Sequence, residues 1–79
     1  MNTPIRCPEL GTTELTLSLW FARPGDRVFE GDRLVEVLLG AATFDLSAPA
    51  TGVLVERWAV PNERLKPGQI LGVIAEEEA

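Results

Sequence analysis

Few residues of this chain have side chains that could take part in covalent chemistry. The 79 residues include no histidine, a single cysteine, Cys7, and a single lysine, Lys66. Structural zinc sites, a Cys–His dyad and a Ser–His–Asp triad are therefore excluded within the chain. Glu36 and Asp45 could be cross-strand neighbours, but carboxylates on a small exposed sheet are usually solvated. We therefore predict that the chain is not an enzyme.

Composition and charge exclude further classes of protein. One cysteine cannot form an internal disulfide, and we expect Cys7 to be a small buried residue rather than a reactive thiol. The formal net charge of −5 argues against a protein that binds nucleic acid. No apolar run approaches the length of about 18 residues that a membrane span needs, and no signal peptide begins the chain. We expect a soluble, cytoplasmic protein.

The elements that must position these residues are strands. Six prolines and seven glycines leave no window long enough for a stable helix. Between the turns, apolar residues alternate with polar ones, most clearly over residues 15–21. Further strand-like runs lie at residues 33–38, 43–47, 52–58 and 69–74. Many short strands between regular turns predict an all-β sandwich or barrel.

The same alternation predicts which side chains face the core. The inward set comprises Leu15, Leu17, Leu19, Val28, Leu34, Val37, Val53, Val55, Leu65, Leu71 and Ile74. Four glycines, Gly25, Gly31, Gly52 and Gly68, are expected to close turns that require a positive φ. These glycines indicate a fold rather than a chemistry.

The chain also repeats itself at an offset of 37 residues. Pro24-Gly25-Asp26-Arg27-Val28 falls on Pro61-Asn62-Glu63-Arg64-Leu65, and further matched pairs follow at the same offset. Two similar halves predict two sheets related by a pseudo-two-fold axis. The tip of the central hairpin and the two termini should then lie at opposite ends of the molecule.

Several motifs resemble those of the biotinyl/lipoyl carrier domains. They are Pro8-Glu9-Leu10-Gly11, Trp20, the Gly25-Asp26-Arg27-Val28 block with Gly31, Asp32 and Leu34, Ala48-Pro49-Ala50-Thr51-Gly52, and Leu65-Lys66-Pro67-Gly68-Gln69-Ile70-Leu71. The resemblance runs from about Ile5 to Ile74. It implies a flattened barrel, or sandwich, of two four-stranded antiparallel sheets. We expect one lipoyl-like domain over residues 1–75, followed by a solvated acidic tail over residues 76–79.

The resemblance also implies where a cofactor would be attached. Lipoyl and biotinyl domains carry it on a lysine at the tip of the central hairpin, and alignment of the flanking strands places Ala41 at that position. Leu38, Leu39 and Gly40 take the places of the Glu, Thr and Asp that typically precede the lysine in lipoyl domains. Both modifications form an amide with a lysine amine, so we expect no cofactor at Ala41. Lys66 lies in another turn, where the family often has an ordinary exposed lysine. Because the preceding residues have diverged as well, natural divergence is favoured over an engineered substitution.

Two segments are candidate interaction surfaces. The first is the apolar hairpin tip, residues Leu38, Leu39, Gly40, Ala41 and Ala42. The second is the loop Gly11, Thr12, Thr13 and Glu14, which matches a loop that contributes to partner choice in lipoyl domains. The simpler interpretations are a compact turn and a solvated polar loop. The functional interpretation is a small docking surface.

Two hypotheses of function follow. The first is a non-enzymatic lipoyl-like interaction module, whose partner would be a component of a 2-oxo acid dehydrogenase complex or a lipoate-handling enzyme. The alternative is a carrier domain of a dihydrolipoamide acyltransferase or of a biotin-dependent carboxylase with its acceptor lysine lost. A carrier domain would be followed by a flexible linker and further domains. The initial Met and the acidic end favour a free-standing protein.

Overall fold

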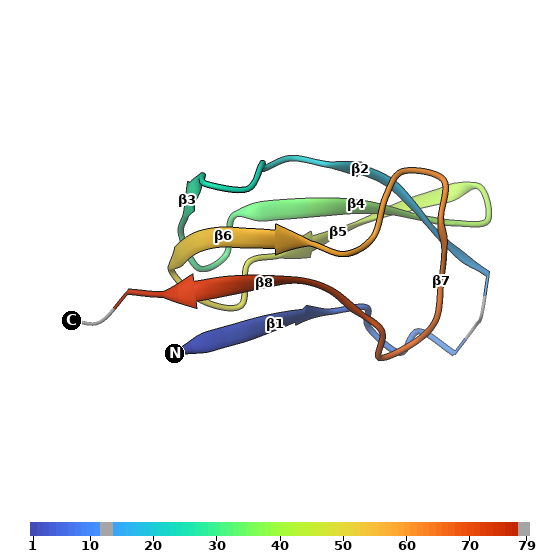
Figure 1. Ribbon diagram of the computed structural model, residues 1–79. Helices are drawn as coiled ribbons and strands as arrows, with labels where there is room; N and C mark the ends of the chain where they lie inside the picture. Colours follow the sequence, from blue (N-terminus) through green and yellow to red (C-terminus); the bar gives the residue numbers. More distant parts are fainter. Residues whose placement is uncertain (12–13, 78–79) are drawn as a thin grey trace.

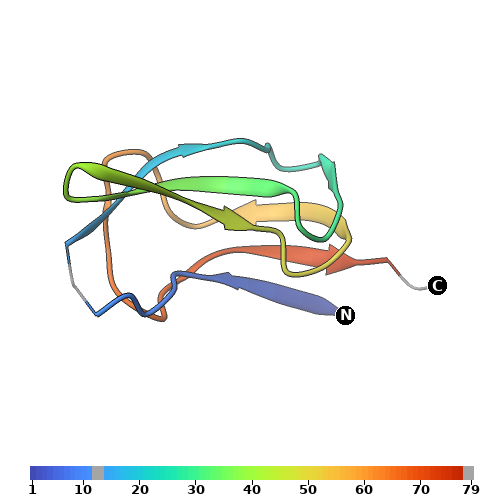
Figure 2. The same ribbon diagram turned by 180° about the vertical axis from the view of Figure 1, so that it is seen from behind.

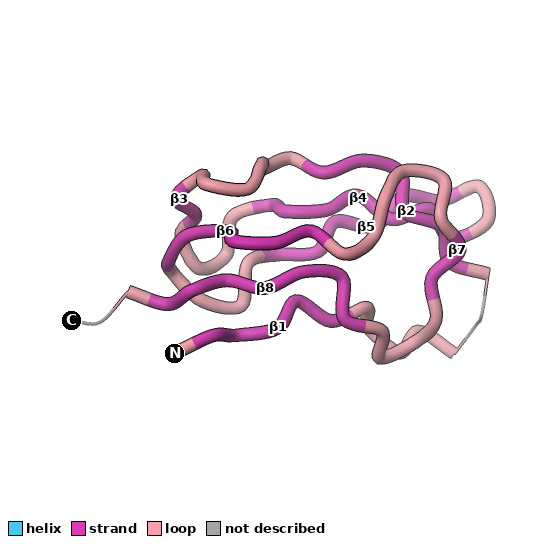
Figure 3. The backbone as a smooth tube through the Cα atoms, viewed as in Figure 1, coloured by secondary structure: helices cyan, strands magenta, loops and turns pink. Residues whose placement is uncertain are grey.

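Two four-stranded antiparallel sheets face each other, as Figures 1 and 3 show. The structure, a computed structural model, describes residues 1–11 and 14–77. Its strands are β1 (Asn2–Arg6), β2 (Leu15–Trp20), β3 (Arg27–Val28), β4 (Arg33–Leu39), β5 (Ala42–Ser47), β6 (Gly52–Arg57), β7 (Arg64–Leu65) and β8 (Ile70–Glu76). The strand orders are β1-β8-β6-β3 and β5-β4-β2-β7. The predicted all-β class is confirmed, and the described residues contain no helix.

Five of the strands were predicted, with ends that differ by one or two residues. The other three, β1, β3 and β7, lack a clear alternating pattern. β3 and β7 have only two residues each, and β1 contains Pro4. A proline inside a short run argues against a central strand, and β1 does lie at the edge of its sheet.

The 37-residue repeat is visible in the backbone hydrogen bonds. β2, β3 and β4 map onto β6, β7 and β8 at this offset, since residues 15, 27 and 33 correspond to residues 52, 64 and 70. Gly25 N donates to Leu54 O at 2.7 Å, and Asn62 N donates to Leu17 O at 2.8 Å. Asn62 stands where the first half has Gly25, and both have a positive φ. The predicted pseudo-two-fold symmetry is confirmed.

The two termini lie at one end of the molecule and the β4–β5 turn lies at the other. Both views of the ribbon show this arrangement (Figures 1 and 2). The long axis of 39 Å, against 19 Å in the other two directions, separates them. The hairpin tip therefore projects away from both chain ends, as predicted.

Leucines and other aliphatic side chains from both halves fill the space between the sheets. The largest fully buried side chains are those of Leu15, Leu17, Leu34, Leu54, Leu65, Leu71, Ile74, Val35, Val37 and Cys7. The alternation predicted seven of these ten side chains, but it omitted Leu54, Val35 and Cys7.

Three predicted core residues do not face the core as expected. Leu19 is 39% exposed and Val55 is 40% exposed, while Val53 is half-buried. In β2, a bulge between Leu17 and Leu19 inserts one residue and turns Leu19 outward. In β6, the inward residues are Gly52 and Leu54, with Leu54 at the place that Leu17 occupies in the first half, and a register shift follows between Leu54 and Glu56. A shift of one residue reverses every side chain of a strand.

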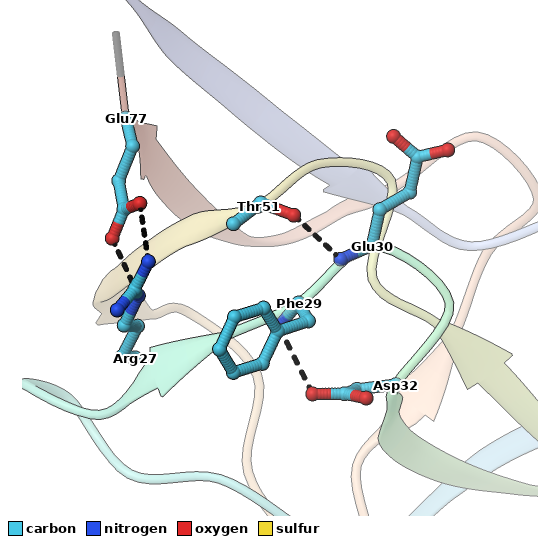
Figure 4. A network of polar contacts seen from close by, with 6 residues as sticks. All are labelled: Arg27, Phe29, Glu30, Asp32, Thr51 and Glu77. Atoms are coloured by element: carbon cyan, nitrogen blue, oxygen red, sulfur yellow. Dashed lines mark hydrogen bonds and ion pairs between the residues drawn. The ribbon is translucent and has the colours of Figure 1, made fainter. Parts of the chain in front are cut away.

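The acidic residues at the end of the domain are held by specific contacts. Glu76 is the last residue of β8, and its carboxylate accepts a hydrogen bond of 2.6 Å from the Thr3 hydroxyl. Arg27 Nε lies 2.7 Å from Glu77 Oε1, and Arg27 Nη2 lies 2.8 Å from Glu77 Oε2 (Figure 4). Glu76 and Glu77 are therefore in contact with residues of β1 and β3. Residues 78 and 79 lie outside the described part of the chain.

Gly52 is required for a different reason from the one predicted. Gly25, Gly31 and Gly68 do have positive φ values, but Gly52 begins β6 with ordinary strand geometry. A Cβ atom at Gly52 would collide with the backbone carbonyl of Ala75 on the neighbouring strand β8. The glycine therefore permits close approach of two strands rather than a turn.

The corrected orientation of β6 can be tested by two neighbouring truncations. Leu54→Ala should lower the free energy of unfolding by about 2–5 kcal/mol, because it empties part of the core. Val55→Ala should lower it by less than about 1 kcal/mol, because the side chain already contacts solvent. Chemical denaturation followed by tryptophan fluorescence measures both. A larger loss for Val55→Ala than for Leu54→Ala would contradict the observed orientation of β6.

Candidate functional site: the β4–β5 hairpin tip

The tip of the central hairpin is a turn of two residues. β4 and β5 pair as Glu36↔Asp45, Leu38↔Thr43 and Leu39↔Ala42, which leaves Gly40 and Ala41 as the turn. Gly40 has a φ of 60°. A glycine with positive φ at the first of the two central positions is the pattern of a type II′ turn, whose twist matches that of the flanking strands. The backbone therefore presents residue 41 at the extreme end of the hairpin.

The apolar side chains of the tip divide between the two faces of the sheet. Leu39 is half-buried and packs against the core. Leu38 lies on the outer face, opposite Thr43 of β5 and Thr16 of β2. Gly40, Ala41 and Ala42 are exposed. Strand alternation thus places the two leucines on opposite faces of the sheet, and Leu38 is half-buried on the outer one.

The described parts of the chain between β1 and β2, on either side of residues 12–13, lie at the same end of the molecule as this turn (Figure 1). Leu15, the first residue of β2, pairs with Leu39 of β4, so Glu14 directly precedes a residue that contacts the hairpin. Gly11 and Glu14 are exposed. Thr12 and Thr13, which were predicted to belong to the same surface, lie outside the described residues.

The two carboxylates singled out from the sequence lie directly opposite each other on β4 and β5. Each of them has another partner. The Ser18 hydroxyl donates to Glu36 Oε2 at 2.8 Å, and Arg33 Nη1 lies 3.5 Å from Asp45 Oδ2. Among residues 1–11 and 14–77, no group of three or more His, Cys, Asp and Glu side chains could hold a metal ion. The arrangement is that of a hydrogen-bonded sheet surface.

Cys7 and Lys66 both lie away from the hairpin tip. Cys7 is 2% exposed, and burial raises the pKa of its thiol, which disfavours the reactive thiolate. Lys66 is exposed in the turn between β7 and β8, where its backbone N–H donates to Gln69 Oε1 at 2.9 Å. The only lysine of the sequence is therefore on a different turn from the one that Gly40 and Ala41 form.

Sequence reasoning missed a second exposed apolar surface, on the outer face of the sheet β1-β8-β6-β3. A shallow groove of about 590 Å³ is lined there by Asn2, Pro4, Val55, Glu56, Trp58, Ile70 and Val73. The groove was missed because Val55 was assigned to the core. The Trp58 indole N–H donates to Glu56 Oε2 at 2.8 Å, which holds the ring along β6. In the part of the chain that the structure describes, no helix is long and apolar enough to cross a membrane.

Comparison with known structures defines the fold more closely. The lipoyl domain of the 2-oxoglutarate dehydrogenase complex from Azotobacter vinelandii superposes with a TM-score of 0.78. The match covers 95% of this chain and 98% of that domain, at 22% sequence identity. The fold is therefore that of a lipoyl domain.

Comparison of sequences defines the family. Residues 3–74 match the biotin/lipoyl family described as "Biotin-requiring enzyme", and the chain belongs to this family. It is 34% identical over 70 residues to the dihydrolipoyllysine-residue acetyltransferase component of the acetoin cleaving system of Pseudomonas putida. It is also 34% identical over 74 residues to the dihydrolipoyllysine-residue succinyltransferase component of the 2-oxoglutarate dehydrogenase complex of Bacillus subtilis. These matches cover 89% and 91% of the chain but only 19% and 18% of the relatives, so it spans about a fifth of their length.

The conformation of Gly40 predicts how the turn responds to substitution. Gly40→Ala should lower the free energy of unfolding by about 1–2 kcal/mol, because a Cβ atom is strained at this φ. Nothing lies within 4 Å of the added atom, so the cost would come from the backbone alone. Ala41→Gly, at the turn position whose φ is not positive, is the matched control and should cost less, since it adds no Cβ atom to a strained position. Equal losses for both variants in chemical denaturation would contradict this account of the turn.

Proposed function

We propose that this chain is a carrier-type domain of a 2-oxo acid dehydrogenase acyltransferase whose hairpin no longer accepts a cofactor, so that its remaining role is to bind proteins. Two relatives named as acyltransferase components support this assignment over a biotin-dependent carboxylase.

The observation that carries the proposal is the composition of the turn. Its two residues are Gly40 and Ala41, neither of which has an amine. Lipoyl and biotinyl groups are attached through an amide bond to a lysine side chain, so the exposed methyl group of Ala41 offers no acceptor. Lys66 is exposed but lies in the turn between β7 and β8, where no two-residue hairpin presents it.

The hairpin keeps what a binding role requires. Leu38 places an apolar side chain on the outer face beside the turn, Ala42 lies on the inner face opposite Leu39, and the exposed Ala41 joins the two at the tip. Gly11 and Glu14 lie on the neighbouring loop segment and would form the polar border of the same surface. An apolar centre with a polar rim is the usual composition of a protein interface.

The absence of an acceptor can be tested by mass. When the chain is incubated with lipoate, ATP and lipoate–protein ligase, its intact mass should not change, and the same should hold for biotin with biotin–protein ligase. A lipoyl domain with a lysine at its hairpin tip serves as the positive control. A gain of one lipoyl or biotinyl group would overturn the proposal, and mapping it to Lys66 would identify the acceptor.

The geometry of the tip can be tested by restoring the amine. Ala41→Lys should become modified only slowly, because Gly40 still stands where the family has an acidic residue. Adding Leu38→Glu, Leu39→Thr and Gly40→Asp to Ala41→Lys should increase the rate of modification. A Lys66→Arg background ensures that any added mass reports residue 41. If neither variant is modified, the alignment that places residue 41 at the acceptor position is wrong.

The binding role is tested separately, with the dehydrogenase component of a 2-oxo acid dehydrogenase complex as the probe. Titration into the isotopically labelled chain should shift the amide resonances of residues 38–42 and of Gly11 and Glu14. Leu38→Glu should weaken the interaction, whereas Val55→Glu on the opposite sheet should leave it unchanged. Equal effects of the two substitutions, or no shifts at all, would argue against this surface.

A further inference from the structure

β5 leaves the longest open sheet edge among the described residues. It is the last strand of its sheet and has six residues. At the opposite edge of that sheet, β7 has two residues, and β3 likewise ends the other sheet with two. The fourth edge strand, β1, has five residues and contains Pro4. A long open edge is a template for pairing with another strand.

The hairpin geometry fixes which backbone groups of β5 face outward. The residues that flank a two-residue turn, here Leu39 and Ala42, form a hydrogen-bonded pair. Along an antiparallel ladder, hydrogen-bonded pairs alternate with non-hydrogen-bonded pairs. Phe44 and Leu46 therefore also face β4. The backbone of Ala48, the next even-numbered residue, faces the same way, since its N–H donates to Asp32 O at 2.7 Å and its C=O accepts from Gly31 N. The N–H and C=O groups of the odd-numbered residues, including Thr43 and Asp45, point away from the sheet.

The internal symmetry shows that the equivalent edge of β1 is blocked. Pro4 pairs with Val73, and Asp45 pairs with Glu36. Val73 and Glu36 are equivalent residues of the two halves, since they are 37 residues apart. Pro4 therefore occupies in β1 the position that Asp45 occupies in β5. Met1 O accepts from Glu76 N, so the even-numbered residues of β1 point their backbone groups outward, and Pro4 removes one outward N–H. β5 contains no proline.

The side chains of β5 add an apolar element to the open edge. Phe44 pairs with Val37 and so lies on the inner side of its sheet, yet it is 42% exposed. Beside the far end of the strand, a recess of about 330 Å³ opens between the two sheets, lined by Pro4, Ile5, Arg6, Leu46, Ser47 and Pro49. The hairpin tip at the near end is apolar as well. The open edge of β5 is therefore flanked by the Phe44 ring, the recess beside Leu46 and the hairpin tip.

We propose that β5 pairs in antiparallel fashion with β5 of a second copy of this chain, with Phe44 opposite Phe44 at the two-fold axis. In this register Thr43 lies opposite Asp45 of the other copy, and each such pair exchanges two backbone hydrogen bonds. The two phenylalanines form the closer, non-hydrogen-bonded pair, in which side chains contact most directly. Ala42 lies opposite Leu46, which brings the apolar tip of each copy to the recess of the other.

Charge favours this register over the one that places Asp45 at the two-fold axis. With Asp45 at the axis, two carboxylates would lie directly opposite each other, which is destabilising. A second copy is favoured over an unrelated extended peptide because one symmetric arrangement covers Phe44, the recess and the tip together. Each copy carries a net charge of −5, so association should strengthen as salt screens the repulsion. The pairing does not depend on whether the hairpin carries a cofactor.

Sedimentation equilibrium of the chain tests the proposal directly. Between about 10 μM and about 1 mM, the average mass should rise from monomer toward dimer. Raising the salt concentration from about 50 mM to about 500 mM should lower the dissociation constant. A chain that stays monomeric throughout this range, or a dimer that weakens as salt is added, would overturn the proposal.

A matched pair of substitutions isolates the backbone of β5. Asp45→Pro should abolish the dimer, because it removes one outward N–H from each Thr43–Asp45 pair. Asp45→Asn loses the same carboxylate, and the same contact with Arg33, but keeps the N–H, so it should dimerise at least as well as the unsubstituted chain. Pro4 at the symmetric position indicates that the fold accommodates proline there. Equal dimerisation of the two variants would exclude β5 as the interface.

A second pair of variants keeps the test independent of the proline. Phe44 and Phe21 are both about 40% exposed, but Phe21 follows the end of β2, lies under the Arg33 guanidinium and is not part of β5. Phe44→Ala should raise the dissociation constant about tenfold, and Phe21→Ala should change it by less than about twofold. A dimer that Phe44→Ala weakens no more than Phe21→Ala does would place the interface elsewhere.

Discussion

The structure depends on an exchange of short strands between its two halves. β3 of the first half pairs with β6 of the second, and β7 of the second half pairs with β2 of the first. Gly25 N–Leu54 O and Asn62 N–Leu17 O are the equivalent bonds that close this exchange. Neither half can complete a four-stranded sheet alone, and the leucines that the two halves bury, Leu17 and Leu54, face the same core. We therefore expect the domain to fold as one cooperative unit.

The features that bear on function lie where this symmetry is broken. β4 and β8 are equivalent strands, but β4 continues through a two-residue turn into β5, whereas β8 ends at Glu76 and pairs with β1 from the start of the chain. One end of the molecule thus has a projecting hairpin and the other has two termini. The edge strands differ as well, since Pro4 in β1 stands at the position of Asp45 in β5. The symmetric part supports the fold, and the asymmetric part contains the hairpin tip and the open edge of β5.

The sequence predicted what depends on local pattern and on the repeat. Alternation identified five strands and most of the core, and the 37-residue offset predicted the placement of the hairpin opposite the termini. The sequence could not predict the bulge after Leu17. Apolar and polar residues alternate in the same way with or without a bulge, but the bulge reverses the side chains beyond it. Two-residue strands such as β3 have no period to detect. The contacts of Glu76 and Glu77 join residues far apart in sequence, so they could not be predicted from the local run of acidic residues.

The position of residue 41 depends on the backbone rather than on its side chain. Gly40 supplies the positive φ, and the β4–β5 ladder fixes the two ends of the turn. The Ala41 side chain is exposed, so a lysine there would require no change in the strands. A domain that carries a cofactor and one that does not can therefore share this hairpin. They differ in the group at the tip, since a modified lysine would end there in an amide-linked cofactor, whereas Ala41 ends in a methyl group.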